Sequence, residues 1–269
     1  MLDELKGMNG SPLAITEAFR SQRQRFLATV SAWDASFWRS PTRCTLWSVH
    51  DVVRHVRDVV SLHIERLGGP PAPFPMGGPF HPATSPATWL AASAGQSCEE
   101  TLDELRLLID QEARLLEHKA LTNPPELVKG QLRRTLHWSV SSAHTFWDAW
   151  MHERDIVLPA GAEPVYPAGE LRVATMYGLL AAAAPAGWQS RYVRTSLALG
   201  GSPDGCYEIT HVDGSIRVCA ASPAESVELS GPTGEVLDSL AGRGPEPQEV
   251  FGSSAAAVAQ LTLLRKVAT

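Results

Sequence analysis

The feature that most constrains the fold is a change of hydrophobic periodicity near residue 160. Before this point apolar residues recur every three to four positions, which is typical of amphipathic helices; after it they alternate with polar residues in short runs, which is typical of half-buried strands. The segment Leu-Pro-Ala-Gly-Ala-Glu-Pro at 158–164 separates the two parts, and its prolines and glycine suit neither a helix nor a strand. A length of 269 residues is also that of two domains. The sequence therefore predicts an α+β protein with domains 1–160 and 161–269.

The first domain is expected to hold four amphipathic helices. Proline or a capping serine marks most of their starts, and glycine or proline follows several of their ends. The expected helices run from Ser11-Pro12 to about residue 33, from Ser48 to 67, from Ser93 or Ser97 to 122, and from about Thr135 to Val157. Residues 68–88 are rich in proline and glycine and are expected to form a long loop. Four such helices predict a bundle.

The second domain is expected to be a smaller α/β unit. An apolar helix at 171–184 comes first. Strands are expected at 195–199, 207–212, 215–220 and 226–230, and further helices at 235–241 and 254–265. Asp213-Gly214 lies between the second and third strands and predicts a tight hairpin turn, because both central residues of that turn take positive φ.

Charge and hydropathy exclude two classes of partner. The chain has 23 basic and 29 acidic residues and no basic cluster, so no nucleic-acid binding is expected. Its longest apolar stretch, 179–184, is far shorter than the roughly 20 residues that cross a bilayer, so no membrane partner is expected. The acidic start of the chain does not resemble a secretory signal, and the four cysteines lack close pairs, as is typical of free thiols. We therefore expect a cytoplasmic protein.

The strongest local pattern is His144-x-x-x-Asp148-x-x-x-His152 in the fourth helix. Residues four apart share one face of a helix, so three potential metal ligands lie in line. His55 in the second helix lies on the apolar face of that helix and should also point into the bundle. Burying an imidazole or a carboxylate is costly unless it is paired or bound to a metal. Two histidines and one carboxylate around a divalent metal leave coordination positions open, as in a catalytic site.

The same residues have simpler interpretations that the pattern leaves open. Asp148 and His152 could form an ion pair that stabilises the helix, and His55 could be a hydrogen-bonded core residue. His144, His63 and His137 could each be structural.

Two motifs carry a resemblance to a known family. Trp47-Ser-Val-His-Asp-Val-Val-Arg-His55-Val resembles the W-T-V-x-D-L-V-x-H-L motif of the mycothiol-dependent maleylpyruvate isomerase family. Phe146-Trp-Asp148-Ala-Trp-Met-His152-Glu-Arg-Asp155 resembles the E-x-x-x-H-x-x-D segment on the fourth helix of that family. The family belongs to the DinB/YfiT-like superfamily, so the resemblance implies an N-terminal DinB-like metal-binding four-helix bundle.

The resemblance also implies the ligands of the metal. They are His55, Asp148 and His152, with zinc as the expected divalent ion. Asp148 stands where the family usually has glutamate. Because aspartate is one methylene shorter, the metal must shift toward the fourth helix, or a water molecule or His144 must complete its shell.

Family members often carry a smaller α/β domain, similar to a sterol-carrier fold, after the bundle. Residues 165–269 suit that domain, and the segment 231–243 resembles a family helix that ends in L-x-G-R. In the family's isomerase an arginine of this domain holds the carboxylate of the substrate, which implies that role for Arg243. The alternative is a surface arginine near a helix C-terminus.

The function implied is that of a metal-dependent, thiol-using enzyme. The metal would activate mycothiol, a low-molecular-weight thiol of actinobacteria, for attack on an electrophilic small molecule, because a metal-bound thiol is deprotonated at neutral pH. The sequence leaves open a mycothiol-dependent isomerase and a thiol S-transferase, in a monomer or homodimer. His144 would act as an acid/base or as a hydrogen-bond partner of a metal ligand. One alternative is a DinB-like enzyme with a thiol-independent reaction in secondary metabolism. Another is a non-enzymatic module that binds a small molecule or lipid.

Overall fold

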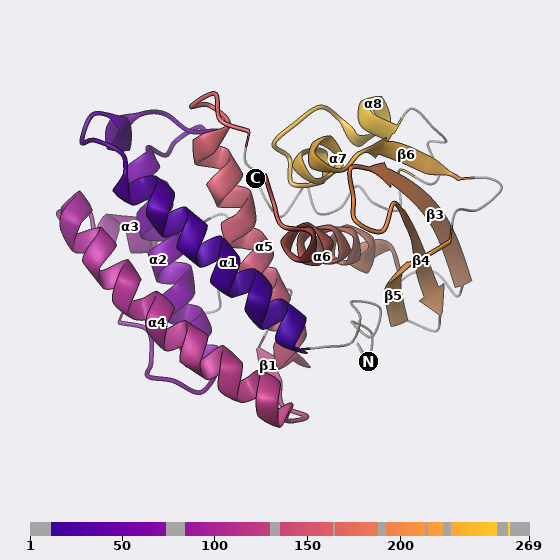
Figure 1. Ribbon diagram of the computed structural model, residues 1–269, viewed down its shortest axis with the longest axis horizontal. Helices are drawn as coiled ribbons and strands as arrows, with labels where there is room; N and C mark the ends of the chain where they lie inside the picture. The colour runs from indigo at the N-terminus through magenta and orange to yellow at the C-terminus, as the bar shows by residue number, and fades with distance from the viewer. Residues whose placement is uncertain are drawn as a thin grey trace. The chain divides into compact units, whose positions relative to one another are not determined.

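The computed structural model describes residues 12–73, 84–129, 135–163, 165–187, 192–212, 215–222, 227–251 and 258 (Figure 1). Contacts divide the chain into two compact units, one formed by Ile15–Val165 and one that holds the described residues from Tyr166 onward together with residues 12–14. The first unit is helical and the second contains a sheet, so the predicted α+β class is confirmed. The domain limits 1–160 and 161–269 stay a prediction.

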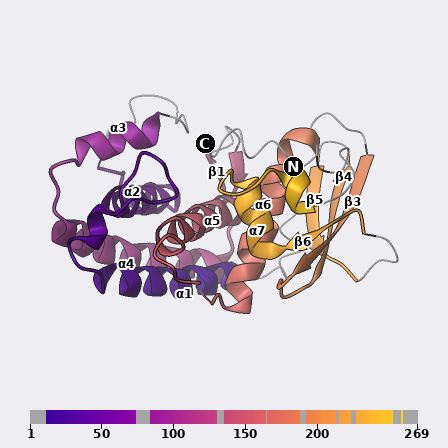
Figure 2. The ribbon, with the colours of Figure 1, turned by 90° about the horizontal axis from the view of Figure 1, so that it is seen from above.

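The first unit is built on four long helices. These are α1 (Pro12–Ser31), α2 (Val49–Arg66), α4 (Cys98–Thr122) and α5 (Trp138–Val157). α2 packs against both α4 and α5, and Figure 2 shows this unit along a second direction. The shorter elements are η2 (Phe37–Arg39), α3 (Ser85–Ala92) and the antiparallel pair β1 (Leu127–Lys129) and β2 (Thr135–His137).

Capping boxes fix the first residues of α2 and α4. The hydroxyl of Ser48 accepts the backbone N–H of Asp51 at 3.2 Å, and the Asp51 carboxylate accepts the backbone N–H of Ser48 at 2.9 Å. Ser97 and Glu100 form the same pair at the start of α4, so Ser97, rather than Ser93, is the cap. The box at Ser48 sets the register of α2 and therefore the direction in which His55 points.

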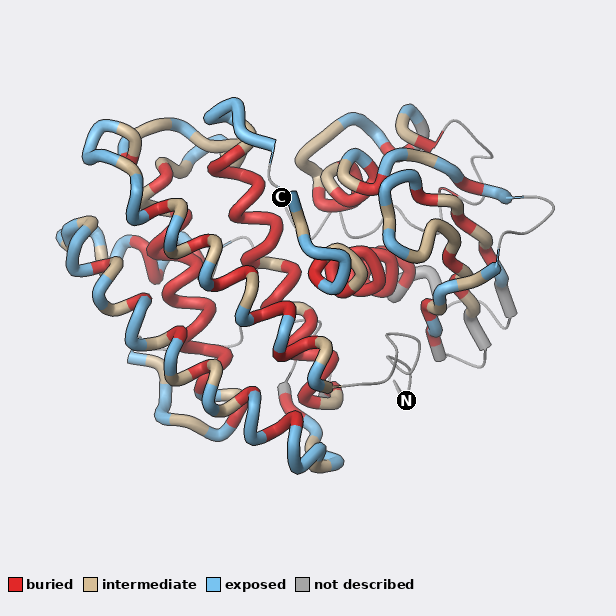
Figure 3. Tube along the Cα trace, viewed as in Figure 1, coloured by how far each residue is buried: buried red, intermediate tan, exposed pale blue. Residues whose placement is uncertain are grey.

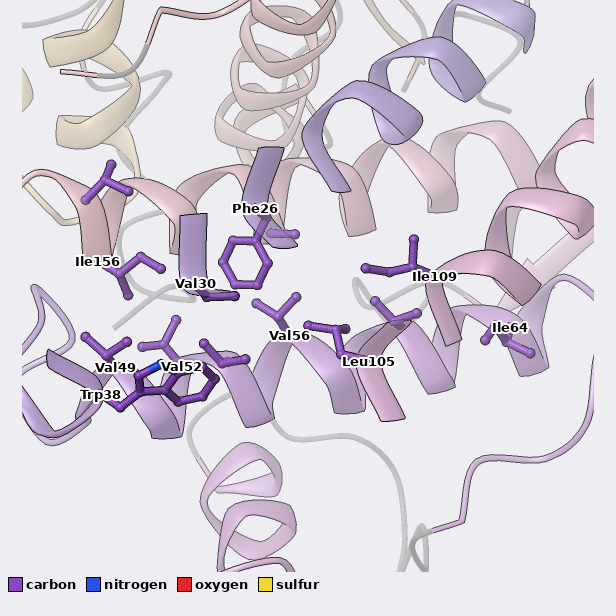
Figure 4. Packing of buried hydrophobic residues seen from close by; sticks show 14 residues of the cluster. Phe26, Val30, Trp38, Val49, Val52, Val56, Ile64, Leu105, Ile109 and Ile156 are labelled. Atoms are coloured by element: carbon purple, nitrogen blue, oxygen red, sulfur yellow. The ribbon is translucent and has the colours of Figure 1, made fainter. Parts of the chain in front are cut away.

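Apolar side chains of several helices form the core of the bundle. Figure 4 shows Val52 and Val56 of α2 among residues from the other helices and from η2. The labelled members from outside α2 are Phe26, Val30, Trp38, Leu105, Ile109 and Ile156. Burying such side chains contributes about 1.5–3 kcal/mol each. This core holds α2 and α5 together where the histidines lie.

Several elements differ from the sequence prediction. The fourth long helix begins at Trp138 rather than near Thr135, because 135–137 pairs with 127–129 as a strand. His137 then caps the helix by accepting the backbone N–H of Ser139. Residues 85–92 form α3 and include part of the expected loop 68–88, with Pro86 in the first turn, where proline is tolerated.

The second unit combines a four-stranded sheet with helices. α6 (Ala168–Gly187) contacts β4 and β5, and α7 (Thr233–Leu240) and α8 (Pro247–Phe251) follow the last strand. The strands are β3 (Tyr192–Gly200), β4 (Cys206–Val212), β5 (Ser215–Ala220) and β6 (Leu229–Pro232), in the order β5-β4-β3-β6. β3 is antiparallel to β4 and parallel to β6. The predicted turn Asp213-Gly214 lies outside the described residues, and so does the predicted helix 254–265 except for Val258, which is helical and buried.

Within the described residues, no helix combines the length and the apolar character that crossing a bilayer requires.

Candidate metal centre

The structure brings His55, Asp148 and His152 together between α2 and α5. His55 Nε2 lies 3.6 Å from Asp148 Oδ2, and His152 Nε2 lies 3.9 Å from Asp148 Oδ1. The two imidazole rings meet edge to face with centroids 4.7 Å apart. One ligand atom from each residue lies within 4.8 Å of the other two. Their role as metal ligands stays a prediction.

The helices place these side chains by simple spacing. Asp148 and His152 are four residues apart on α5, and His55 projects from the face of α2 that packs against α5. α5 is buried along almost its whole length (Figure 3). The exceptions are His144 and Asp148, which are partly exposed and lie one turn apart on one face. In the candidate centre, the imidazoles of His55 and His152 are therefore buried, whereas the carboxylate of Asp148 is partly exposed to solvent.

Two polar atoms of this group have no hydrogen-bond partner in the described part of the chain. They are His55 Nδ1 and Asp148 Oδ2, and both are buried. An unpartnered buried carboxylate oxygen is costly, and a cation beside it would remove that cost. Two imidazoles and one carboxylate form a donor set that catalytic zinc sites use, with a further position open. The residues present therefore suit the metal that the resemblance implies.

Asp148 and the two histidines shift one another's pKa values. Burial alone would raise the pKa of Asp148, but the nearby His152 and His55 outweigh burial and hold that pKa well below its usual range. Burial would likewise lower the pKa of His152, yet the carboxylates of Asp148 and Asp155 raise it above its usual range. Without a cation, a proton on His152 balances the carboxylates. A metal would replace that proton, since a ligating imidazole must be neutral.

The second nitrogen of His152 faces another carboxylate. His152 Nδ1 lies 3.1 Å from Asp155 Oδ2, and Asp155 is fully buried. The Cys44 thiol donates to the same oxygen at 3.1 Å and lies 3.7 Å from His152 Nδ1. The guanidinium of Arg43 is 3.3 Å from the other oxygen of Asp155. Metal-bound histidines usually donate their free N–H to such a carboxylate, which fixes the tautomer and the ring.

Cys44, His152 and Asp155 also form a group that has metal-ligand spacing. The charge of Arg43 beside Asp155 disfavours a cation at this position, because like charges at short range repel. We therefore interpret Asp155 as the residue that orients His152. Sequence reasoning assigned no role to Asp155, although its i, i+3 spacing from His152 was a usable signal. Arg43 and Cys44 come from the irregular segment between η2 and α2, where no periodicity pointed to them.

An aromatic side chain borders the group. The centroid of the Trp47 ring lies 4.9 Å from the ring centroid of His55 and 5.9 Å from that of His152. Trp47 precedes the cap residue Ser48, so the start of α2 places both the aromatic ring and the histidine.

His144 and Arg243, the two predicted catalytic residues, lie outside the ligand group. His144 is one turn before Asp148, and burial lowers its pKa to about 4, so its imidazole is neutral at pH 7. Arg243 follows α7 in the second unit, and its guanidinium donates to the carbonyl oxygen of Ala241 at 3.3 Å. That contact is of the kind expected for an arginine at a helix C-terminus. The catalytic roles of both residues stay predictions.

Comparison with known proteins identifies the family. Residues 19–157, more than half of the chain, match the family model described as the mycothiol maleylpyruvate isomerase N-terminal domain. The chain belongs to this family. The resemblance inferred from the two motifs is thereby confirmed.

Solved structures show the same fold. The chain is similar to the crystal structure of the mycothiol-dependent maleylpyruvate isomerase, with 16% sequence identity and a TM-score of 0.55 over 87% of this chain and 90% of that chain. A histidine-to-alanine mutant of that isomerase matches with the same values. No curated protein matches the chain in sequence.

Proposed function

We propose that this protein is a metal-dependent enzyme that uses mycothiol to attack an electrophilic small molecule. The observation that carries the proposal is the convergence of His55, Asp148 and His152, whose ligand atoms lie within 4.8 Å of one another at a partly exposed point of α5. Membership of the mycothiol maleylpyruvate isomerase N-terminal domain family supports the thiol as cosubstrate. Zinc is the proposed ion, because its preferred donors are those present.

The residues of the candidate site would have three different roles in this reaction. His55, Asp148 and His152 would hold the metal, while Asp155 keeps the Nδ1 proton of His152 so that Nε2 faces the metal. Bound zinc would supply one thing, a thiol that is deprotonated at neutral pH. His144 is neutral at that pH and can accept the thiol proton at a ring nitrogen, one turn from Asp148.

Two reactions are consistent with this chemistry. The thiolate sulfur adds to an electrophilic double bond, forming a C–S bond while a proton is taken up at the neighbouring carbon. In an isomerase the resulting single bond rotates, and the neighbouring carbon then gives up its proton as the C–S bond breaks, so that the double bond re-forms and the thiol is regenerated. In an S-transferase the C–S bond remains and the thiol is consumed. We propose the isomerase as the first reaction to test, because the structural relative is named for one.

The experiment is to incubate the protein with mycothiol and maleylpyruvate, the compound in the name of that relative, and to measure both product and remaining thiol. An isomerase gives product at constant thiol, whereas a transferase loses one thiol for each electrophile consumed. His152→Ala is expected to abolish either reaction. Turnover that is unchanged when mycothiol is omitted would contradict the thiol-using enzyme and favour the thiol-independent alternative.

A further inference from the structure

One arginine of the bundle differs from the others that are buried or half-buried. Five of these face a carboxylate: Arg23 faces Glu112, Arg25 faces Glu153, Arg43 faces Asp155, Arg54 faces Asp51, and Arg57 faces Asp58 and Glu104. The buried Arg154 instead has its guanidinium over the ring of Trp150, 5.0 Å from the ring centroid. Arg66 makes neither a hydrogen bond nor an ion pair with any residue that the structure describes, although it is only partly exposed. A half-buried guanidinium without a carboxylate partner is energetically unfavourable.

Arg66 lies on the same face of α2 as His55. The two residues are 11 positions apart, which is three helical turns or about 16 Å along the axis. Side chains of an α-helix tilt toward its N-terminus, so that of Arg66 leans back toward His55. The contact of 2.9 Å between His63 Nε2 and Ser142 Oγ places this end of α2 beside the part of α5 that carries His144.

The charge of Arg66 on α2 influences two titratable residues of α5. Burial lowers the pKa of Arg66 to about 10, and the carboxylates of the neighbouring Glu65 and, more weakly, of Asp148 act against this decrease. Burial is the main cause of the low pKa of His144, and the positive charge of Arg66 lowers it further. The guanidinium is therefore charged at neutral pH and close enough to His144 and Asp148 to influence both.

Arg66, His144 and Asp148 share one further property, which is partial exposure. All other residues of α5 are buried, so a ligand that reaches the candidate metal along α5 meets the accessible side chains of His144 and Asp148, and the charge of Arg66 acts on both of these residues. A guanidinium offers two parallel N–H donors that match a carboxylate. A cation at a helix C-terminus also interacts favourably with the helix dipole, but that interaction does not require the charge to face Asp148.

We propose that Arg66 binds a carboxylate group of the electrophilic substrate, so that the bundle itself recognises an anionic electrophile beside the metal. The assignment rests on the proposed function, because the site for the reacting group is the metal held by His55, Asp148 and His152. It gives α2 two tasks, with His55 holding the metal and Arg66 holding the substrate.

The test uses small thiols as probes, so that it does not depend on knowing the substrate. Protein loaded with Co²⁺ is titrated with mercaptopropionate and, separately, with mercaptoethanol, which has a hydroxyl in place of the carboxylate. Binding is followed by the absorption that a thiolate bound to Co²⁺ produces. Mercaptobutyrate, which has one more methylene than mercaptopropionate between thiol and carboxylate, tests whether a longer ligand is needed to span the distance from the metal to the guanidinium. We expect at least one of the two mercapto-acids to bind about tenfold more tightly than mercaptoethanol, as a charge-assisted hydrogen bond provides.

The variants are Arg66→Gln and, as a matched control, Arg114→Gln. Arg114 is an exposed arginine on α4, so its replacement removes the same charge away from the site. Arg66→Gln is expected to lose the preference for the carboxylate, and Arg114→Gln to keep it. Arg66→Gln should also have a Tm equal to or above that of the control, because it removes an unpartnered charge.

Three results would overturn the assignment. One is equal affinity of the unmodified protein for all three thiols. Another is a carboxylate preference that survives in Arg66→Gln. The third is a Tm of Arg66→Gln clearly below that of Arg114→Gln, which would mark Arg66 as a structural residue. The absence of thiolate absorption with every probe would be a different outcome, since it would overturn the proposed function and this assignment together.

Discussion

At the scale of single residues, His152 is the centre of the site because a carboxylate lies beside each of its ring nitrogens. Asp148 is near Nε2 and Asp155 is near Nδ1. Helical spacing was enough to predict that His55, Asp148 and His152 share the interior of the bundle. It did not reveal the contacts of Asp155 with Cys44 and Arg43, since these come from an irregular segment whose path depends on tertiary packing. The lack of a partner for Arg66 was equally invisible, because it is a property of everything around the residue.

The first prediction concerns Asp155. Asp155→Asn removes the carboxylate that orients His152, and we expect zinc affinity to fall about 10–100-fold while one metal site is retained. Competition with a chromophoric chelator measures the affinity, and circular dichroism checks the fold. Cys44→Ser serves as the control, because a hydroxyl can still donate to Asp155. A larger loss of affinity in Cys44→Ser than in Asp155→Asn would contradict the orienting role and indicate that the metal binds at Cys44.

The second prediction concerns the departure from the family pattern at Asp148. Asp148→Glu restores the usual residue at a partly exposed position, and we expect zinc affinity to be unchanged or higher, measured by the same competition. Loss of the metal in this variant would show that the centre is built differently from those of its relatives.

At the scale of elements, buried polar contacts connect the helices as well as the apolar core. His63 of α2 contacts Glu112 of α4 at 2.7 Å, and Glu112 also accepts hydrogen bonds from Arg23 of α1. The long helices were predictable because each has a regular apolar face and, in α2 and α4, a capping serine. The start of α5 was predicted too early, because residues 135–137 pair with 127–129 as a short strand, and the apolar pattern of so short a segment does not distinguish a strand from a helix.

The third prediction is the response of this polar network to acid. Burial would raise the pKa of Glu112, but the charge of Arg23 and the contact with His63 outweigh burial and lower it to about 2. Burial also lowers the pKa of His63. For both residues the pKa in the folded state lies below the pKa in the unfolded state. As the pH falls, the unfolded chain therefore binds more protons than the folded protein, and folding becomes less favourable. The contribution of His63 is lost below about pH 6.5, and that of Glu112 between about pH 4.5 and 2.

Glu112→Gln tests this account through unfolding in urea. Near neutral pH the variant should lose about 3–5 kcal/mol of unfolding free energy, because it leaves Arg23 buried without its charge partner. The difference from the unmodified protein should shrink toward pH 3, where Glu112 begins to lose its own charge. Glu117→Gln on the exposed side of α4 is the control and should change stability little at either pH. An equal loss at both pH values for Glu112→Gln would contradict the prediction.

At the scale of the whole molecule, the change of periodicity near residue 160 correctly indicated a helical unit followed by one with a sheet. The segment between them is exposed from Pro159 to Glu163, and Gly161 has a φ of +77°, which suits glycine. We propose that the two units are separate domains that meet in this segment.

The fourth prediction follows from that proposal. A protease that cleaves after glutamate should cut the folded protein first at Glu163, because the exposed linker lies between compact units. Mass spectrometry of the early fragments identifies the site, and Glu163→Gln should slow the cleavage. First cleavage inside α4 or α5 would contradict the proposed boundary.

The most direct measurement of the central claim is the metal content of the protein purified without chelator. We predict about one divalent ion, zinc, per chain in the unmodified protein and in His118→Ala, a control on the exposed face of α4. His55→Ala and His152→Ala should each remain folded and lose the ion. Stoichiometric metal in either of these two variants, or none in the unmodified protein, would contradict the account.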